Sequence, residues 1–328
     1  METTAFNEDE RMAQRIAGFA PASAAIRPFM MEQHREFFAH LSYLFVGVMD
    51  AEGWPLATVL TGEPGFVGAP DPTTLRIAAM PVSGDPASAG FHEGGRIGVL
   101  GLDLVTRRRN RANGIVAHVD ADAITVAVER SFGNCPKYIQ RREARPVGRE
   151  RRPIERLDRL DAAARVFIAR ADTLFVASRS RDDVTEGGGA DVSHRGGPPG
   201  FVRVGADVLT IPEYPGNRYM NTLGNLLGEP RAGLLFVDFE RGDLLQLQGH
   251  AVVNWASDAA ADLPGAERSW RFHVTRAWRR PCALALDWTF LDFAPTTARI
   301  AGLAARAEAR PRPTGSASDS QNQRPSFD

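Results

Sequence analysis

The hydrophobic positions of this chain fall mostly into short runs, not into long amphipathic helices. Short apolar or β-branched runs separated by clusters of Gly, Pro and Asp are typical of strands joined by tight turns. In the first half of the chain such runs occur at Tyr43–Val48, Leu56–Thr61, Leu75–Ala79, Ile97–Leu104, Gly114–Val119 and Ile124–Arg130. Strands of this number and length predict a small antiparallel barrel or sandwich.

The second half repeats this pattern of short runs. They occur at Thr173–Ser178, Gly200–Val204, Val208–Ile211, Gly233–Phe239, Leu244–Val253 and Trp270–Ala277. The stretch from Gly233 to Val237 is apolar on both faces of the expected strand. A strand of this kind is typically covered on both sides. We therefore expect it to lie between its own barrel core and the other half of the chain.

Helical periodicity is limited to a few segments. We expect helices at Met31–Leu41, Arg152–Ala171 and Asn217–Leu227, with the clearest spacing of apolar residues in the second. That helix follows the Arg-rich stretch Arg141–Arg151, where we place the link between the two halves. The end of the chain, Pro311–Asp328, is rich in Pro, Ser, Gln and Asn, a composition that favours disorder.

An internal repeat is the strongest signal in the sequence. Gly62-Glu-Pro-Gly-Phe-Val67 recurs as Gly197-Pro-Pro-Gly-Phe-Val202 at an offset of 135, and the same offset relates Gly98 to Gly233. We interpret this as one domain present twice. The expected organisation is an N-terminal arm (1–30), a first barrel (31–145), a linker helix (146–172), a second barrel (173–300) and a disordered tail (301–328).

Composition narrows the class of protein. The formal net charge of −1 over 328 residues argues against bulk electrostatic binding to nucleic acid or to a membrane surface. The two cysteines cannot form a disulfide framework, and no apolar run approaches the ~20 residues of a membrane span. We therefore expect a cytoplasmic protein without nucleic-acid or membrane partners.

One candidate site follows the last strand of the first half. The segment Asn134-Cys135-Pro136-Lys137-Tyr138 contains the single Lys of a chain with 39 basic residues. Arg and Lys are not interchangeable at chemical sites, so Lys137 attracts attention. Pro136 predicts a helix start, where free N–H groups can hold an anion. The alternative is a plain structural corner with an inert Cys135.

Two further candidates lie in the second half, at His194-Arg195 and at Asn217-Arg218. Both pairs adjoin glycines that let a ligand approach the backbone, and Asn217-Arg218 precedes an expected helix start. The equivalent segments of the first half carry neither pair; Gly84-Asp85 stands opposite Gly216-Asn217. This difference places the site mainly in the second copy. The alternatives are a solvated hairpin and simple helix capping.

Basic and amide side chains also mark the next hairpin. The first copy has an Arg cluster that ends at Arg111, and the second has Gln246 and Gln248 on one strand face. The cluster is either a solvated surface or points at a phosphate shared between the barrels. Phosphate-loop, dinucleotide-fingerprint, zinc-protease and serine-hydrolase motifs are missing from the sequence, and the seven His show no metal-ligand spacing, so we expect no metal site.

Together these segments resemble the pyridoxamine 5′-phosphate oxidase-like superfamily of FMN-binding split β-barrels. The resemblance is to its long two-barrel members and rests on Gly65-Phe-Val67, Arg107–Gly114, Asn134–Arg141, Ser193–Gly197, Gly216-Asn217 with Leu223-Gly-Asn225, and Leu245–Gly249. It implies a mainly β fold of two tandem split barrels with a few short helices. It also implies FMN in the groove between them, so that one chain forms a pseudo-dimer; association of two chains stays open.

The resemblance further implies a set of cofactor-binding residues and a reaction class. The set is His194, Arg195, Asn217, Arg218, Gln246, Asn134, Cys135, Lys137 and Arg111. The reaction class is flavin-dependent electron or hydride transfer with a small-molecule substrate or an electron donor such as NAD(P)H. The substrate-binding residues of the oxidases themselves are not matched near the C-terminus. The open alternatives are a haem-handling protein with His194 or His250 as axial ligand and a non-enzymatic flavin carrier or sensor.

Overall fold

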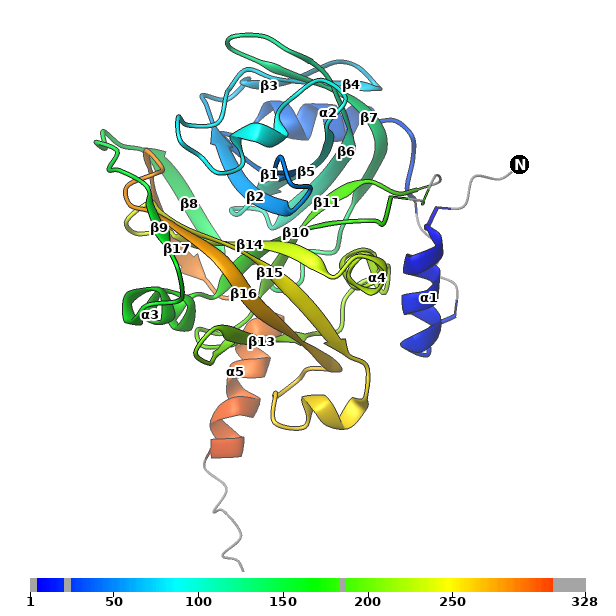
Figure 1. The fold of residues 1–328 in the computed structure, drawn as a ribbon, viewed down its shortest axis with the longest axis vertical. Helices are drawn as coiled ribbons and strands as arrows, with labels where there is room; N and C mark the ends of the chain where they lie inside the picture. Colours follow the sequence, from blue (N-terminus) through cyan, green and yellow to red (C-terminus); the bar gives the residue numbers. More distant parts are fainter. Residues whose placement is uncertain (1–4, 21–24, 183, 185–186, 309–328) are drawn as a thin grey trace, which may run out of the picture.

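The computed structural model describes residues 5–20, 25–182, 184 and 187–308, and most of them build two curled antiparallel sheets (Figure 1). The first has the strand order β2-β1-β5-β6-β7-β4-β3, and the second has the equivalent order β11-β10-β14-β15-β16-β13-β12. This is the expected mainly β fold of two split barrels.

The first barrel consists of β1 (Tyr43–Met49), β2 (Pro55–Thr61), β3 (Val67–Asp71), β4 (Thr74–Ile77), β5 (Arg96–Asp103), β6 (Arg108–Val119) and β7 (Ile124–Gly133). The second consists of β10 (Thr173–Arg179), β11 (Ala190–Gly196), β12 (Arg203–Val204), β13 (Val208–Glu213), β14 (Arg231–Asp238), β15 (Asp243–Asn254) and β16 (Arg268–Arg280). In each barrel the second strand in the chain, β2 or β11, forms a free edge of its sheet.

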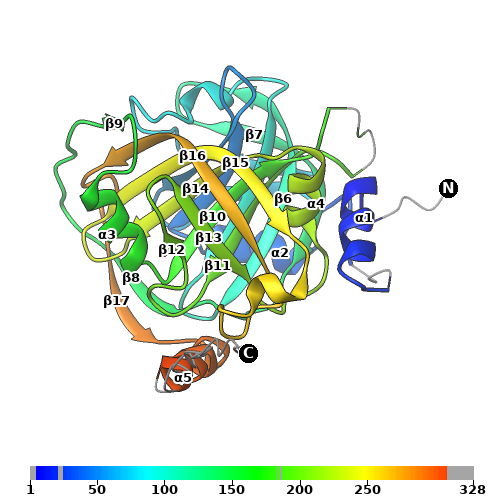
Figure 2. The same ribbon diagram turned by 60° about the horizontal axis from the view of Figure 1, so that its bottom comes forward.

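Short elements surround the barrels. The helices are α1 (Glu8–Ile16), α2 (Glu32–Ala39), α3 (Ala162–Arg170), α4 (Asn221–Gly228) and α5 (Pro295–Glu308), with 3₁₀ turns η1 (Ser88–Gly90) and η2 (Ser257–Ala260). Strand β8 (Arg141–Pro146) pairs with β17 (Leu286–Asp292), and β9 (Glu155–Leu157) pairs with β16. Figure 2 shows α1 beside α4. It also shows α5 next to the end of β17. Within the described residues, no helix has the length and apolar character needed to cross a bilayer.

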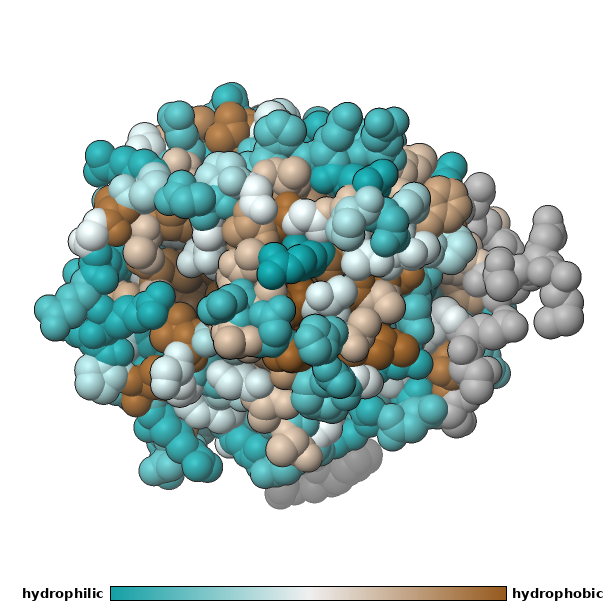
Figure 3. Space-filling view, turned by 90° about the horizontal axis from the view of Figure 1, so that it is seen from above, coloured by the Kyte–Doolittle hydropathy of each residue, from teal (hydrophilic) through white to brown (hydrophobic). Residues whose placement is uncertain are grey.

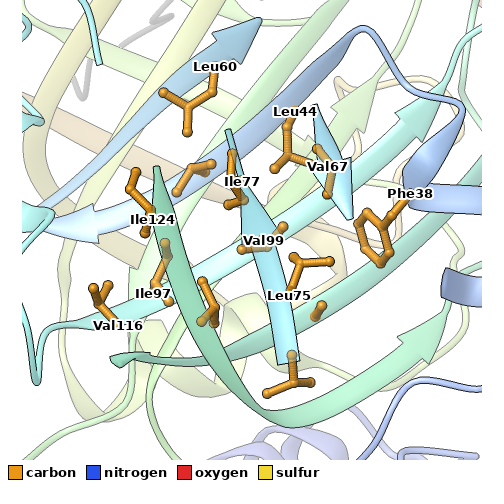
Figure 4. Packing of buried hydrophobic residues seen from close by; sticks show 14 of the residues in the cluster. Phe38, Leu44, Leu60, Val67, Leu75, Ile77, Ile97, Val99, Val116 and Ile124 are labelled. Carbon is orange, nitrogen blue, oxygen red and sulfur yellow. The ribbon is translucent and has the colours of Figure 1, made fainter. Parts of the chain in front are cut away.

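Each barrel has its own apolar core. In the first, alternate residues of the strands and Phe38 from α2 point toward one another (Figure 4). In the second, Trp270 and Phe272 are fully buried among the leucines of β10, β14 and β15. The outer surface differs from these cores. On the face seen from above, polar residues are interspersed with small apolar patches (Figure 3).

A third apolar cluster joins the two barrels. At its centre the rings of Phe45 and Phe175, which occupy equivalent positions in β1 and β10, stack with centroids 3.5 Å apart. Glycine permits the close approach of the strands around this pair. A Cβ at Gly98 in β5 would lie 2.7 Å from the Cα of Asp191 in β11, and the equivalent Gly233 meets Leu56 of β2 in the same way. The barrels therefore pack with approximate two-fold symmetry.

The structure corrects three expectations about the segments outside the barrels. The helix expected over Arg152–Ala171 and the linker helix 146–172 shrink to α3, because Asp161 caps the helix at Ala164 N and the residues before it form β9. The Arg-rich stretch taken as a link begins with strand β8. The tail from residue 301 is helical up to Glu308, and 309–328 lie outside the described residues.

Strand β11 shows why the pattern of apolar runs missed an element. Its sequence, Ala-Asp-Val-Ser-His-Arg-Gly, is mostly polar, yet all but one of its residues are buried. An edge strand whose side chains make polar contacts to a second barrel carries no apolar signature of its own. This strand nevertheless supplies one wall of the site described below.

We expect Gly98→Ala to destabilise the protein by about 1–3 kcal/mol, because the added methyl group has to push β5 away from the backbone of β11. Urea unfolding of the variant measures this loss. Gly68→Ala is the control, since a Cβ at that position meets nothing within 4 Å. Equal stability of the two variants would contradict the close approach of the barrels.

Candidate functional site

A pocket opens where β11 and α4 of the second barrel face β6 and the loop after β7 of the first. It encloses about 830 Å³ of empty space, its open mouth included. Of the nine residues predicted from the sequence, it brings together His194, Arg195, Asn217, Arg218, Asn134, Cys135, Lys137 and Arg111. Both barrels therefore line one pocket, whereas the differences between the two copies had placed the site mainly in the second.

Gln246 is the predicted residue that does not line this pocket. Its side chain is fully buried between the barrels, where its amide nitrogen donates to Ala57 O at 2.9 Å. Gln248, two residues along the same strand face, donates to Pro55 O at 3.4 Å. Both amides therefore bind the free edge of β2. Gln246 thus helps to join the barrels on the side of the interface that is related to the pocket by the approximate symmetry.

Two arginines of β6 bind the free edge of β11. Arg111 donates to Val192 O (3.2 Å), to Asn221 Oδ1 (3.2 Å) and to Ser193 Oγ, and it lies 3.3 Å from an oxygen of Asp191. Each of its guanidinium nitrogens thus has a protein acceptor. Arg111 lines the pocket but acts mainly as a clamp between the barrels.

Arg109, two residues earlier on the same face of β6, is bound less completely. It donates to Cys135 O at 3.0 Å and to His194 O at 3.4 Å, and it has no carboxylate partner among the described residues. Burial lowers the pKa of Arg109 to about 10. The guanidinium remains charged at neutral pH, so the pocket contains a positive charge that no described carboxylate neutralises.

His194 is held neutral beside these arginines. Burial, followed by the charges of Arg109 and Arg195, lowers its pKa well below 6.5. Its Nδ1 lies 3.4 Å from Nη1 of Arg109, which can only donate, so Nδ1 accepts and the proton resides on Nε2. That N–H group is buried without a described partner. The pocket thus contains an imidazole N–H donor that has no acceptor among the described residues.

Other buried polar atoms of the pocket lack partners as well. They are Oδ1 of Asn134, Nε of Arg195 and Oε2 of Glu213. Arg195 and Glu213 form an ion pair in which Nη1 of Arg195 donates to Oε1 of Glu213 at 2.8 Å. Buried polar groups without partners are costly, and their concentration here is what a polar ligand would relieve.

The loop after β7 covers the pocket from the side of the first barrel. Pro136 does not begin a helix, contrary to the expectation; the segment 134–140 is a loop in which Tyr138 adopts a positive φ of 64°. The loop lies against Gly196, where a Cβ would come within 2.0 Å of Tyr138 O. The ring of Tyr138 stacks on Tyr214 at 5.3 Å, and burial raises the pKa of both phenols to about 12. Exposed Lys137 lies 3.4 Å from Pro215 O.

The opposite wall is the segment that leads into α4. Arg218 and Met220 have positive φ values of 65° and 58°, and such strain in non-glycine residues is concentrated at functional sites. No side chain caps the start of α4, so its first N–H groups can donate hydrogen bonds to an anion. Oδ1 of Asn217 accepts from Tyr219 N at 3.1 Å and shapes this turn.

The N-terminal segment completes the pocket, which the sequence did not suggest. Phe19 lines it, with the guanidinium of Arg218 4.8 Å from the ring centroid. Helix α1 holds this segment in place, since buried Glu10 accepts from Asn221 of α4 at 2.6 Å. Asn7 and Glu10 form a capping box, and this Asn-x-x-Glu spacing was the available signal for the helix.

Positive charge is in excess in the pocket. It is lined by two carboxylates, Glu213 and Glu267, and by six cationic side chains: Arg109, Arg111, Lys137, Arg195, Arg218 and Arg268. Arg109, Lys137 and Arg218 form no ion pair with any residue that the structure describes. No group of three His, Cys, Asp or Glu that could bind a metal is found in the described parts of the chain. The arrangement is therefore suited to an anion that also offers an aromatic or polar surface.

Comparison with known proteins yields distant structural matches only. No protein-family model matches the chain, and no curated protein matches it. Among solved structures it is similar to HupZ of Group A Streptococcus (TM-score 0.28, 16% identity, 36% of this chain and 91% of that one). It is also similar to an FMN-binding protein from Syntrophomonas wolfei (0.26, 10%, 35% and 82%). A third match is a Clostridium acetobutylicum protein described as of the pyridoxinephosphate oxidase family (0.27, 10%, 39% and 92%).

The names of two of these neighbours, the FMN-binding protein and the member of the pyridoxinephosphate oxidase family, agree with the resemblance seen in the sequence. Each one matches little more than a third of this chain, although the match covers most of the neighbour. TM-scores this low do not indicate what the present chain binds. The chemistry of the pocket has to be argued from its own residues.

The neutral state of His194 predicts a pH dependence of stability. Because its folded-state pKa is below 6.5, the unfolded chain binds the extra proton, and stability falls as the pH drops below that value. His194→Asn cannot take up this proton, so between pH 6.5 and 5.5 it should lose about 1 kcal/mol less than the wild type. Urea unfolding at the two pH values measures the difference. Equal losses would show that His194 is not buried in its neutral form.

Proposed function

We propose that the chain binds FMN in the pocket between its two barrels and is a flavin-dependent oxidoreductase. The observation that carries this proposal is the excess of unpaired positive charge beside stacked aromatic rings, formed by both barrels together. A phosphate monoester with a charge of about −2 would neutralise that excess. A flat heteroaromatic ring with polar edges would satisfy the unpaired buried atoms.

The residues present fit the two ends of such a ligand. Arg218 and the uncapped start of α4 are suited to the phosphate; Arg109 adds positive charge to the pocket, and Nε of Arg195, which has no described partner, can donate to the ligand. The aromatic side chains of Tyr138, Tyr214 and Phe19 are suited to the ring. Nε2–H of His194 would donate to a ring oxygen or nitrogen, and Oδ1 of Asn134 would accept from a ring N–H.

The bound flavin supplies the electron or hydride transfer, and the protein supplies position and electrostatics. Lys137, Asn134 and Cys135 from the first barrel close the pocket on the side opposite α4. The positive charge of Lys137 favours negative charge that develops on a nearby ring. Since one chain provides both walls, it acts as a pseudo-dimer, and a small electron donor such as NAD(P)H would enter through the open mouth. No nucleic-acid or membrane partner is part of this proposal.

A haem-handling protein is the second candidate, and one observation favours it. Nε2 of His194 lines the pocket without a described partner, and it can serve as an axial ligand once its proton is released or moves to Nδ1. His250, the other imidazole considered, lies exposed on β15 with its ring 4.9 Å from that of Trp54. The absorption spectrum of the purified protein separates the candidates. Paired near-ultraviolet and blue bands indicate flavin, and a Soret band indicates haem.

The phosphate assignment predicts a selective loss of affinity. Arg218→Gln should weaken FMN binding by about 10- to 100-fold, because a hydrogen bond to a charged group contributes about 1.5–3 kcal/mol. Binding of riboflavin, which lacks the phosphate, should not change. Titration calorimetry or flavin fluorescence measures both affinities. Arg96→Gln is the control, since Arg96 pairs with exposed Glu129 outside the pocket. If neither flavin binds the wild type, the proposed function is wrong.

Lys137 should affect the redox step as well as binding. We expect Lys137→Ala to slow the reduction of bound FMN by NADPH, or to weaken FMN binding, by about tenfold, since a favourable charge near the ring is lost. Lys137→Arg keeps the charge and should retain most of both. Stopped-flow absorbance follows the reduction, and a wild type that binds FMN without being reduced would be a carrier. Unchanged rate and affinity in Lys137→Ala would rule out its role.

A further inference from the structure

A buried polar cluster occupies the position that is equivalent to the pocket on the other side of the interface. It consists of Thr58, Asp85, Gln246 and Arg280. Thr58 and Gln246 correspond to Ser193 and Arg111 at the offset of 135 that relates the two copies. Arg280 corresponds to Asn134: it pairs with Leu244 in β15, whereas Asn134 binds the equivalent Arg109 of β6.

An ion pair closes this second position completely. Nη1 of Arg280 lies 2.6 Å from Oδ2 of Asp85, and the two side chains are only 2% and 0% exposed. The same nitrogen is 3.3 Å from both Thr58 Oγ1 and Gln246 Oε1. A charged pair sealed from solvent in this way is held by its hydrogen bonds as much as by its charges.

The carboxylate of Asp85 sits in a cradle that resembles an anion-binding site. Its oxygens accept from the hydroxyl of Thr58 at 2.5 Å, from the amide of Gln246 at 3.3 Å and from the backbone N–H of Ala87 at 2.9 Å, in addition to Arg280. At the matched positions of the pocket, Ser193 and Arg111 bind the carboxylate of Asp191, and the neutral Asn134 stands in place of Arg280.

The two copies differ in the charge of the residue that precedes a short helical segment. In the second barrel the equivalent turn before α4 carries the neutral Asn217, whose Oδ1 accepts from the N–H two residues later as Oδ1 of Asp85 does, and Arg218 follows it in the pocket lining. In the first barrel the equivalent turn before η1 carries Asp85, whose carboxylate enters the cradle. One copy thus offers a cation to a ligand, and the other supplies an anion of its own.

We propose that Asp85 is a built-in ligand of Arg280 that closes the position across the interface from the pocket, so that the chain binds a single flavin phosphate and the closed position accepts a small carboxylate only when Asp85 is removed. The first part rests on the proposed function; the second part rests on the cluster alone. In this arrangement the side chain of Asp85 replaces the bound anion and fixes Arg280 between the barrels.

Chemical rescue tests the built-in ligand. Asp85→Ala leaves Arg280 buried without a counter-ion and opens space for a formate ion, so we expect its Tm to fall by about 5–10 °C. Sodium formate, compared with sodium chloride at equal ionic strength, should restore part of that loss with saturation, as a ligand that binds only the folded state does. The wild type should show no such dependence.

The matched control is the double variant Asp85→Ala/Arg280→Met, which lacks the cation and should not respond to formate. If Asp85→Ala does not fold alone, its refolding yield with and without formate becomes the measurement. A response of the single variant that the double variant shares, or no response in either measurement, overturns the proposal.

Stoichiometry gives the second arm. Titration of the wild type with FMN should saturate at one equivalent per chain, and two equivalents would overturn the proposal. If the wild type binds no FMN, the proposed function fails, whereas the formate measurements still decide whether Asp85 occupies an anion site.

Discussion

The free edge strand of each barrel is the constraint on which the rest of the structure depends. A split barrel leaves the outer carbonyl groups of β2 or β11 without strand partners, and buried backbone groups have to be satisfied. Here the other barrel satisfies them. Arg111 and Arg109 donate to Val192 and His194 of β11, whereas Gln246 and Gln248 donate to Ala57 and Pro55 of β2. The barrels therefore depend on each other, and their interface is both apolar and polar.

The pocket lies where the hydrogen bonds from the arginines of β6 to the edge of β11 end. Beyond His194 the edge of β11 no longer lies under β6, and the loop after β7 crosses above it at Gly196. The same arginines that hold the barrels together thereby bring positive charge to the rim of an opening. The same arginines thus hold the barrels together and give the pocket its capacity to bind an anion. The proposed flavin would use charges that the fold already requires.

Approximate two-fold symmetry relates the pocket to the cluster around Asp85. The side chains leave the first open and close the second. On one side cations remain without carboxylates, and several polar atoms lack partners. On the other side Asp85 neutralises Arg280 and both side chains are buried, and Nε of Arg280 is the atom of this pair without a described partner. A pair of equivalent barrels can in this way keep one place rigid and leave the other open. The rigid side stabilises the orientation that shapes the open side.

The sequence by itself determined the mainly β class, the repeated pattern of strands in the two halves and eight of the residues that line the pocket, because turn residues, apolar runs and repeated motifs are local signals. The role of Gln246, the participation of Phe19 and strand β11 were decided only by the tertiary structure. In the sequence, Gln246 stands at a strand position where the resemblance implies a cofactor-binding residue. In the structure its amide donates to the carbonyl of Ala57 in β2. Phe19 reaches the pocket through contacts of α1 with α4, more than 200 residues away in the chain. Such contacts depend on how the two barrels pack, and no local pattern encodes them.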